Sequence, residues 1–144
     1  MKIRWSSNFL ALLLIASAVP RANAQETIKL VSSLPRTGSA NAQTTSIVNG
    51  IRLAIEEGGN KAGHFNIAYE DWDDASPERG AWDPAVEAAN ADKAIKDPDV
   101  MVYLGTYNSG ASKISMPKLN QAGLAMISPG NTWPGLTKPG IGEP

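Results

Sequence analysis

The sequence predicts an α/β fold in which a parallel, doubly wound sheet carries helices on both faces. Three observations lead to this prediction. Short apolar runs typical of strands alternate with longer segments of helical apolar spacing, in the order β-α-β-α-β-α-β. The connections between them are short, which favours right-handed crossovers between parallel strands. The third run, "VMVYLG", is almost wholly apolar, as in a strand that is buried on both faces of a parallel sheet.

The first half of the pattern predicts two strands with a helix between them. "IKLVSSL" (28–34) reads as a strand that runs into the Pro- and Gly-containing loop "PRTGSA". Residues 43–59 have apolar side chains at helical spacing, and Gly58 and Gly59 are expected to end that helix. "FNIAYED" (65–71) alternates apolar and polar residues and is predicted to be the second strand.

The next segment, "DPAVEAANADKAIKDPD", predicts a second helix with clear signals at both ends. Asp83 is a suitable N-cap, Pro84 occupies the first helical position, and Pro98 ends the helix. "VMVYLG" (100–105) follows directly and is predicted to be the third strand.

The last part of the chain predicts one more helix and one more strand. The helix is expected over residues 109–122, and Gly123 ends it. Pro117 lies inside this helix and is expected to kink it. "LAMIS" (124–128) is the predicted fourth strand.

The first 24 residues stand apart from this pattern. A basic start is followed by the uncharged apolar run 9–19 and by "ANA" (22–24), which fits an A-x-A cleavage site. These features predict a secretory signal peptide over 1–24 and a mature, periplasmic segment over 25–144. The alternative is a membrane anchor, but the apolar run is short of the roughly 20 residues that a span needs.

Composition narrows the possible chemistry of the mature segment. The chain has no Cys and one His, so there is no disulfide, no thiol nucleophile and no cysteine-based metal site. The mature segment has ten Lys and Arg residues against fourteen Asp and Glu, a net charge of −4. It contains no basic run, so nucleic acid is not an expected partner.

"GTYNSGAS" (105–112) follows the third strand and opens the third helix. It matches the phosphate-loop pattern G-x-x-x-x-G-K-[ST] at both glycines and at the final serine, but Ala111 stands where the lysine belongs. A helix N-terminus without that cation suits a smaller anion such as a carboxylate. The alternative interpretation is that Asn108 or Ser109 only caps the helix.

The end of the fourth strand adds further donors to the same edge of the sheet. In "ISPGNTWPGLT" (127–137), Gly130 can present a backbone N–H, and Thr132 can present both a hydroxyl and an N–H. Ligands of open α/β sheets bind outside the carboxyl ends of the strands. Together with Ser109, these residues predict a cluster of neutral donors that face one point.

Tryptophan is concentrated at this same edge. The three Trp of the mature segment lie in or beside the loops 34–42, 71–82, 105–109 and 128–133, namely Trp72, Trp82 and Trp133. This bias indicates a contact surface. Packing within the loops is an equally good explanation.

Several stretches, taken in order, resemble a known family. They are "IKLVSSLPRTG", "YEDWDDASPERG", "VYLGTYNSGAS", "LNQAGLAMISPGNT" and "PGLT". Residues 28 to about 137 resemble the type I periplasmic solute-binding proteins of ABC importers, in the branched-chain amino acid (leucine/isoleucine/valine) branch. The resemblance implies the first lobe of a two-lobe domain whose second lobe is absent from residues 25–144.

The resemblance also implies a ligand site. It places the α-carboxylate of an amino acid at Ser109, Gly130 and Thr132, with Tyr107 and Asn108 on the same turn. The donors would be the hydroxyl and N–H groups of the serine and threonine and the N–H of the glycine. No catalytic residue, metal ligand or cofactor is implied.

Two departures from the family's pattern bear on the identity of the ligand. Amino-acid binders of the family often have an aromatic residue at the position of Gln43. The segment "SPERGAWDP", which contains Trp82, is several residues longer than the usual form. Relatives on this scaffold bind amides, urea or aromatic acids, so these remain alternatives to a branched-chain amino acid.

The expected function is therefore capture of a small solute outside the cytoplasm and its delivery to the membrane permease of an ABC transporter. A ligand-binding sensor domain and an amide- or urea-binding receptor on the same scaffold are alternatives. A secreted hydrolase is a further alternative, but the sequence offers no credible nucleophile–His pair. We also expect residues 25–144 alone to bind ligand weakly or not at all.

Glu70, Asp71, Asp73 and Asp74 form an acidic cluster at the end of the second strand. Such a cluster can hold a metal or perform acid–base chemistry, or it can cap loops. The family resemblance favours the second interpretation. His64 follows a glycine in a predicted turn and is expected to be a surface residue.

Overall fold

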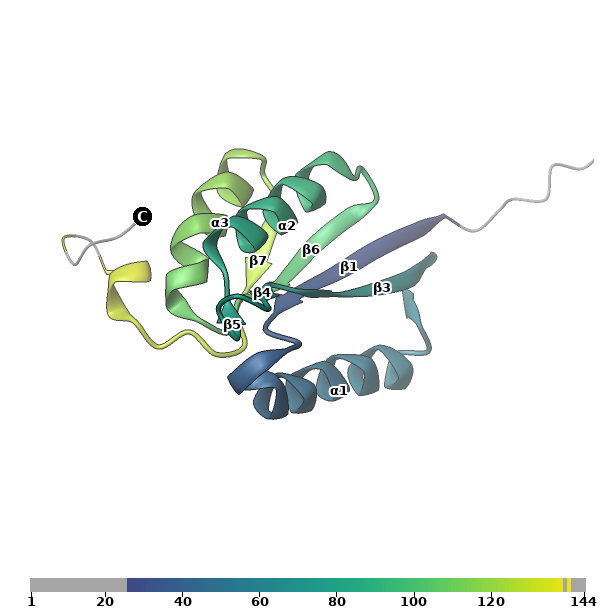
Figure 1. Ribbon diagram of the computed structural model, residues 1–144. Coiled ribbons are helices and arrows are strands. Elements are labelled where there is room, and N and C mark those ends of the chain that lie inside the picture. The colour runs from purple at the N-terminus through teal and green to yellow at the C-terminus, as the bar shows by residue number, and fades with distance from the viewer. Residues whose placement is uncertain (1–25, 139, 141–144) are drawn as a thin grey trace, which may run out of the picture.

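The structure is a computed structural model that describes residues 26–138 and 140. Its main body is a sheet with helices on both faces (Figure 1). The predicted signal peptide, residues 1–24, lies outside the described residues. Within residues 26–138 and at 140, no helix combines the length and the apolar character needed to cross a membrane.

The main sheet has five strands. Their order across the sheet is β2 (Lys61–Ala62), β3 (Phe65–Asp73), β1 (Thr27–Leu34), β6 (Val100–Gly105) and β7 (Ala125–Ile127). Strand β1 pairs in parallel with β3 and with β6, and β7 pairs in parallel with β6. The predicted parallel sheet is confirmed for these four strands, whose carboxyl ends lie at one edge.

The main sheet also has a strand at one margin that the sequence did not predict and that is not parallel. Strand β2 is antiparallel to β3, with Ala62 opposite Phe65. Only Gly63 and His64 separate the two strands, and a two-residue turn can join only antiparallel neighbours. Both residues of β2 are exposed, so no apolar pattern in the sequence marks this strand.

The helices cover both faces, which confirms the doubly wound arrangement. Helix α1 (Asn41–Glu57) lies on one face, and α2 (Pro84–Lys96) and α3 (Ser109–Gln121) lie together on the other (Figure 1). Helix α3 continues past Pro117 to Gln121. Two short 3-10 helices, η1 (Gly38–Ala40) and η2 (Pro134–Leu136), lie in the loops after β1 and β7.

The hydrophobic core lies between the sheet and the α2–α3 layer. Its buried members are Val31, Ala91, Ala94, Val100, Tyr103 and Leu119. They come from two central strands and two helices, so the core fixes the helix N-termini above the carboxyl edge of the sheet. His64 is exposed, as expected, with its ring 4.0 Å from that of Phe65.

A small hairpin, which no pattern in the sequence predicts, connects β3 to α2. Its strands are β4 (Ala75–Ser76) and β5 (Ala81–Trp82), which pair antiparallel. The N–H groups of Arg79 and Gly80 both donate to the carbonyl of Ser76 and close the turn. The hairpin projects from the carboxyl edge of the main sheet.

The predicted N-cap of α2 is confirmed, and it allows a stability prediction. The Asp83 carboxylate accepts hydrogen bonds from the N–H groups of Ala85 (2.7 Å) and Val86 (3.4 Å). Replacing an N-cap of this type by alanine costs about 0.5–2 kcal/mol. We therefore expect Asp83→Ala to lower the free energy of unfolding by about 1 kcal/mol. Asp99→Ala, in the exposed turn after α2, should change it much less.

The measurement is the midpoint of urea unfolding, monitored by circular dichroism. Equal midpoints for Asp83→Ala and Asp99→Ala would contradict the assigned role of the cap.

Candidate functional site

Five residues that the sequence singled out lie together at the carboxyl edge. They form what we call the donor cluster: Tyr107, Asn108, Ser109, Gly130 and Thr132. The first three follow β6 and open α3, and the last two lie in the loop after β7. Because β6 and β7 are parallel neighbours, both loops leave the sheet at the same edge.

Ser109 joins the two loops directly. It is the first residue of α3, and its Oγ accepts hydrogen bonds from the backbone N–H groups of Thr132 (3.2 Å) and Trp133 (3.3 Å). A serine hydroxyl has two acceptor positions and one proton. With both acceptor positions used, the Ser109 hydroxyl has its proton left to donate to a ligand.

The structure argues against simple capping as the role of the α3 N-terminus. Asn108 is the N-cap residue, but its side chain makes no capping hydrogen bond. Its Oδ1 is buried and has no hydrogen-bond partner among the described residues. The first N–H groups of a helix lack intrahelical partners and carry partial positive charge. The N-terminus of α3 therefore has the chemistry to attract an anion.

The loop after β7 is held by Ser128, a residue that no sequence motif marked as part of the site. Its Oγ donates to the carbonyl of Thr106 (2.8 Å) and accepts from the N–H groups of Gly130 (3.3 Å) and Asn131 (3.0 Å). The N–H groups of Gly130 and Thr132, expected to face a ligand, are thus bonded within the chain in this structure. A ligand would have to share or replace those hydrogen bonds.

Tyr107 explains why residue 130 is a glycine. A Cβ at Gly130 would lie 2.9 Å from Cδ2 of the Tyr107 ring, closer than real side chains approach. The half-buried tyrosine therefore packs directly against the backbone of the second loop. This contact holds the two loops of the donor cluster at a fixed separation.

Two of the three tryptophans of the mature segment lie beside the donor cluster. A Cβ at Gly110 would lie 2.7 Å from Cζ2 of Trp82, so the indole of the hairpin rests on the first turn of α3. The backbone of Trp133 bonds to Ser109, and Lys113 Nζ lies 3.8 Å from the centroid of the Trp133 ring. The signal for the Trp82 contact was present in the sequence as the second glycine of "GTYNSGAS".

Trp72 belongs to a different surface. Its ring packs against the core, its Nε1 donates to Glu70 (2.9 Å), and Lys93 Nζ lies 3.7 Å from the ring centroid. The third tryptophan is therefore explained by packing, as the alternative interpretation expected.

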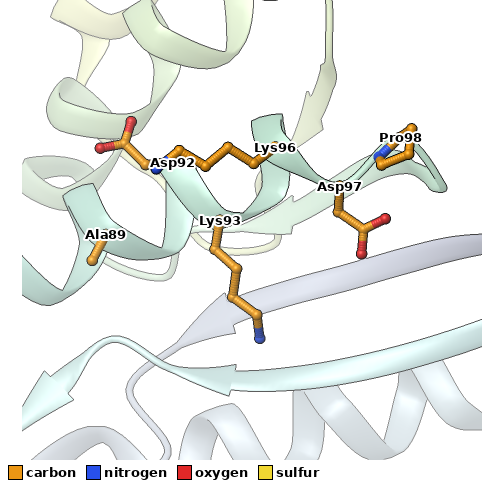
Figure 2. A pocket seen from close by; sticks show the side chains of 6 residues that line it. All are labelled: Ala89, Asp92, Lys93, Lys96, Asp97 and Pro98. Carbon is orange, nitrogen blue, oxygen red and sulfur yellow. The ribbon is translucent and has the colours of Figure 1, made fainter.

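The same surface includes a hollow beside α2 with a volume of about 630 Å³, lined by Ala89, Asp92, Lys93, Lys96, Asp97 and Pro98 (Figure 2). Both of its carboxylates are engaged within the chain. Asp97 is 2.6 Å from Lys29 Nζ, and Asp92 is 2.7 Å from Lys118 Nζ. Lys93 and Asp97 point toward the strands (Figure 2). These pairs favour a structural role for the hollow.

The acidic cluster at the end of β3 serves mainly as a set of loop caps. Asp73 accepts from the N–H groups of Arg36 and Ala75 (both 2.8 Å) and from the hydroxyl of Thr37. Asp71 Oδ2 lies 3.0 Å from Arg36 Nε. These bonds fix the loop after β1 to the end of β3, which agrees with the capping interpretation.

Asp74 is the exception in this cluster. It is fully buried, and neither carboxyl oxygen has a hydrogen-bond partner among the described residues. Burial, together with the charges of Glu87 and Asp73, raises its pKa to about 8. Burial also raises the pKa of Glu87, which is hydrogen-bonded to Ser33 (2.6 Å) and Tyr103 (3.0 Å). Both carboxyls are buried inside the fold.

The arrangement defines a class of protein: an α/β domain with a parallel main sheet, helices on both faces, and hydroxyl and backbone N–H groups gathered at the carboxyl edge. The solved structures that it resembles are more specific. One is the branched-chain amino acid transporter substrate-binding protein LivJ from Streptococcus pneumoniae, in complex with isoleucine. It is 27% identical, with a TM-score of 0.67, over 78% of this chain and 31% of that one.

Two further solved structures share the fold. The leucine-binding protein LivK from Thermotoga maritima is 24% identical, with a TM-score of 0.68, over 78% of this chain and 30% of that one. A solute-binding protein from Rhodopseudomonas palustris, in complex with 3,4-dihydroxybenzoic acid, is 25% identical, with a TM-score of 0.62. The match covers 71% of this chain and 26% of that one. No family model matches the chain, and no curated protein matches it.

The chain thus has the fold of the type I periplasmic binding proteins, as the sequence resemblance implied. It spans 31% and 30% of the length of the first two of these relatives. The structural match establishes the fold of the shared part.

Proposed function

We propose that this protein is the extracytoplasmic substrate-binding component of an ABC importer, and that residues 25–144 form the first lobe of its binding domain. The ligand is a small carboxylate, in the first instance a branched-chain amino acid. One observation carries the proposal: Ser109 at the start of α3 is bonded to the N–H groups of Thr132 and Trp133. Two loops thereby bring hydroxyl and N–H donors to one point.

The chemistry of these groups suits a carboxylate better than a phosphate. The donors are neutral, and Ala111 occupies the position of the phosphate-loop lysine. Preorganised N–H and hydroxyl groups at a helix N-terminus bind an anion without a point charge. The relatives described above include an isoleucine complex and a dihydroxybenzoic acid complex, and both ligands carry a carboxylate.

The proposed role also specifies location and partner. The predicted signal peptide over 1–24 would direct export to the periplasm. Delivery would be to the membrane permease of the transporter. Binding would proceed by closure of two lobes around the ligand, and the role requires no catalysis, metal or cofactor.

The test is isothermal titration of the full-length mature protein with leucine, isoleucine, valine, benzoate, acetamide and urea. We expect binding of at least one carboxylate. Ser109→Ala should weaken it about 10- to 100-fold, because a hydrogen bond to a charged group contributes about 1.5–3 kcal/mol. Thr132→Val should also weaken carboxylate binding.

Ser46→Ala, an exposed serine on α1, is the matched control and should leave affinity unchanged. Binding of acetamide or urea alone would keep the fold assignment and reject a carboxylate ligand. A folded protein that binds none of the six compounds would overturn the proposal.

A further inference from the structure

The β4–β5 hairpin is fixed at its base to the main body of the protein. The N–H of Asp74 donates to the carbonyl of Leu34 (3.1 Å), and the N–H of Asp83 donates to the carbonyl of Asp74 (2.7 Å). The hydroxyl of Ser76 also bonds to the Asp83 carboxylate (2.9 Å). Because Asp83 caps α2, the hairpin is tied to both β1 and α2.

The tip of the hairpin is fixed as well. The N–H of Ser39 in η1 donates to the carbonyl of Gly80 (3.1 Å). A Cβ at Gly38 would lie 2.1 Å from that carbonyl oxygen, so only glycine allows this approach. The hairpin is therefore held at three places: the end of β1, the cap of α2 and η1 in the loop after β1.

This support places the Trp82 indole at the N-terminus of α3. Its benzo edge lies against Gly110, the residue directly after Ser109. The side chain is half-buried. On its own hairpin, Arg79 lies 5.9 Å from the indole centroid, and its Nε donates to the carbonyl of Trp82 (3.1 Å). The ring is thus held from one side by Arg79 and from another by the first turn of α3.

We propose that Trp82 is a specificity-determining residue, which forms an apolar side wall for a carboxylate held at Ser109. This inference rests on the proposed function and narrows its substrate class. Consecutive Cα atoms are about 3.8 Å apart, so a group attached to a carboxylate at Ser109 comes within reach of a ring that touches Gly110. The ligand class is a carboxylate with an aliphatic or aromatic substituent, in preference to a small hydrophilic acid.

The physical reason is the large flat area of the indole. Burying apolar substituent atoms against it contributes roughly 25 cal/mol per Å² of apolar surface removed from water. A ligand without a substituent gains nothing from this wall. A ligand with an apolar substituent and one without it make the same carboxylate contacts. Trp82 should therefore change the difference in affinity between the two.

The test is isothermal titration of the full-length mature protein with leucine, benzoate and glycine. Glycine shares the carboxylate and lacks the side chain. Trp82→Ala should weaken the tighter of leucine and benzoate about tenfold or more and change glycine binding less than about twofold, as expected for truncation of a Trp contact. Trp82→Phe should recover most of the lost affinity.

Gly110→Ala is an independent second variant. The added methyl group would lie 2.7 Å from the ring, so it should displace Trp82 and reproduce the binding defect with the indole still present. Trp72→Phe is the matched control, since Trp72 packs against the core and Lys93 and should not affect selectivity. Thermal unfolding of each variant verifies that it is folded.

The outcomes separate this inference from the proposed function. If the unmutated protein binds carboxylates and Trp82→Ala leaves all affinities unchanged, Trp82 does not determine specificity. The proposed function would still stand. Equal losses for leucine and glycine would assign Trp82 to the support of the fold and also overturn the inference. If the unmutated protein binds no carboxylate, the proposed function itself fails.

Discussion

The free energy of unfolding is expected to fall as the pH rises from about 4 to about 8. Asp74 is fully buried and its pKa is raised to about 8, whereas in the unfolded chain it ionises near the ordinary value for Asp. Between these values the folded state binds one more proton than the unfolded state. Stability then decreases with pH, at most by about 1.4 kcal/mol per pH unit for one proton.

The other carboxyls whose pKa is clearly shifted do not oppose this trend within the window. The raised pKa of Glu87 acts in the same direction. Hydrogen bonds and cations lower the pKa of Glu70, Asp83, Asp92 and Asp97. The stability that these four groups contribute is lost only as the pH falls below their unfolded values, near 4. The expected optimum for stability is therefore mildly acidic.

Urea unfolding at pH 5, 6, 7 and 8 measures this dependence. Asp74→Asn removes the titrating group while keeping its shape, so it should flatten the curve and raise stability at pH 8 relative to the natural residue. Asp92→Asn is the control, since Lys118 lowers the pKa of the Asp92 carboxyl and its removal should leave the slope between pH 5 and 8 as it is. Parallel curves for the natural protein and Asp74→Asn would show that Asp74 is ionised in the folded state.

Replacing Tyr103 by alanine is expected to cost about 3–5 kcal/mol of unfolding free energy, the range for truncating a buried aromatic side chain. Tyr103 is the largest fully buried side chain of the described residues, and it belongs to the main core cluster. Its hydroxyl donates to Glu87 Oε1 at 3.0 Å. Alanine would remove the core contacts and leave that buried oxygen without its donor.

Tyr103→Phe separates the two contributions. It keeps the ring and removes only the donor to Glu87, at a cost of about 1–3 kcal/mol for an unsatisfied buried group. Met101→Ala, on the same strand with a 44% exposed side chain, is the matched control and should cost much less. Denaturant unfolding of the three variants checks this order, and a Tyr103→Ala cost no larger than that of Met101→Ala would contradict it.

The donor cluster illustrates how far the sequence reaches toward a site. Parallel strands end at one edge, so the pattern of strands and helices was enough to predict that Ser109 and Thr132 lie together, and they do. The sequence could not reveal that the N–H groups of Thr132 and Gly130 bond to Ser109 and Ser128. Which acceptor an N–H reaches depends on distances of a few tenths of an ångström between two separate loops.

The sequence by itself determined the succession of four parallel strands and three helices along the chain and the Asp83 cap of α2, and it carried the family resemblance. The order of the strands across the sheet came only from the structure. Apolar periodicity and caps act over a few neighbouring residues, so they are readable locally. Only the tertiary structure decided that Asp74 is buried without a partner and that Trp82 rests on Gly110. Burial and ring contacts depend on which distant segments meet in the fold, and no local pattern records that.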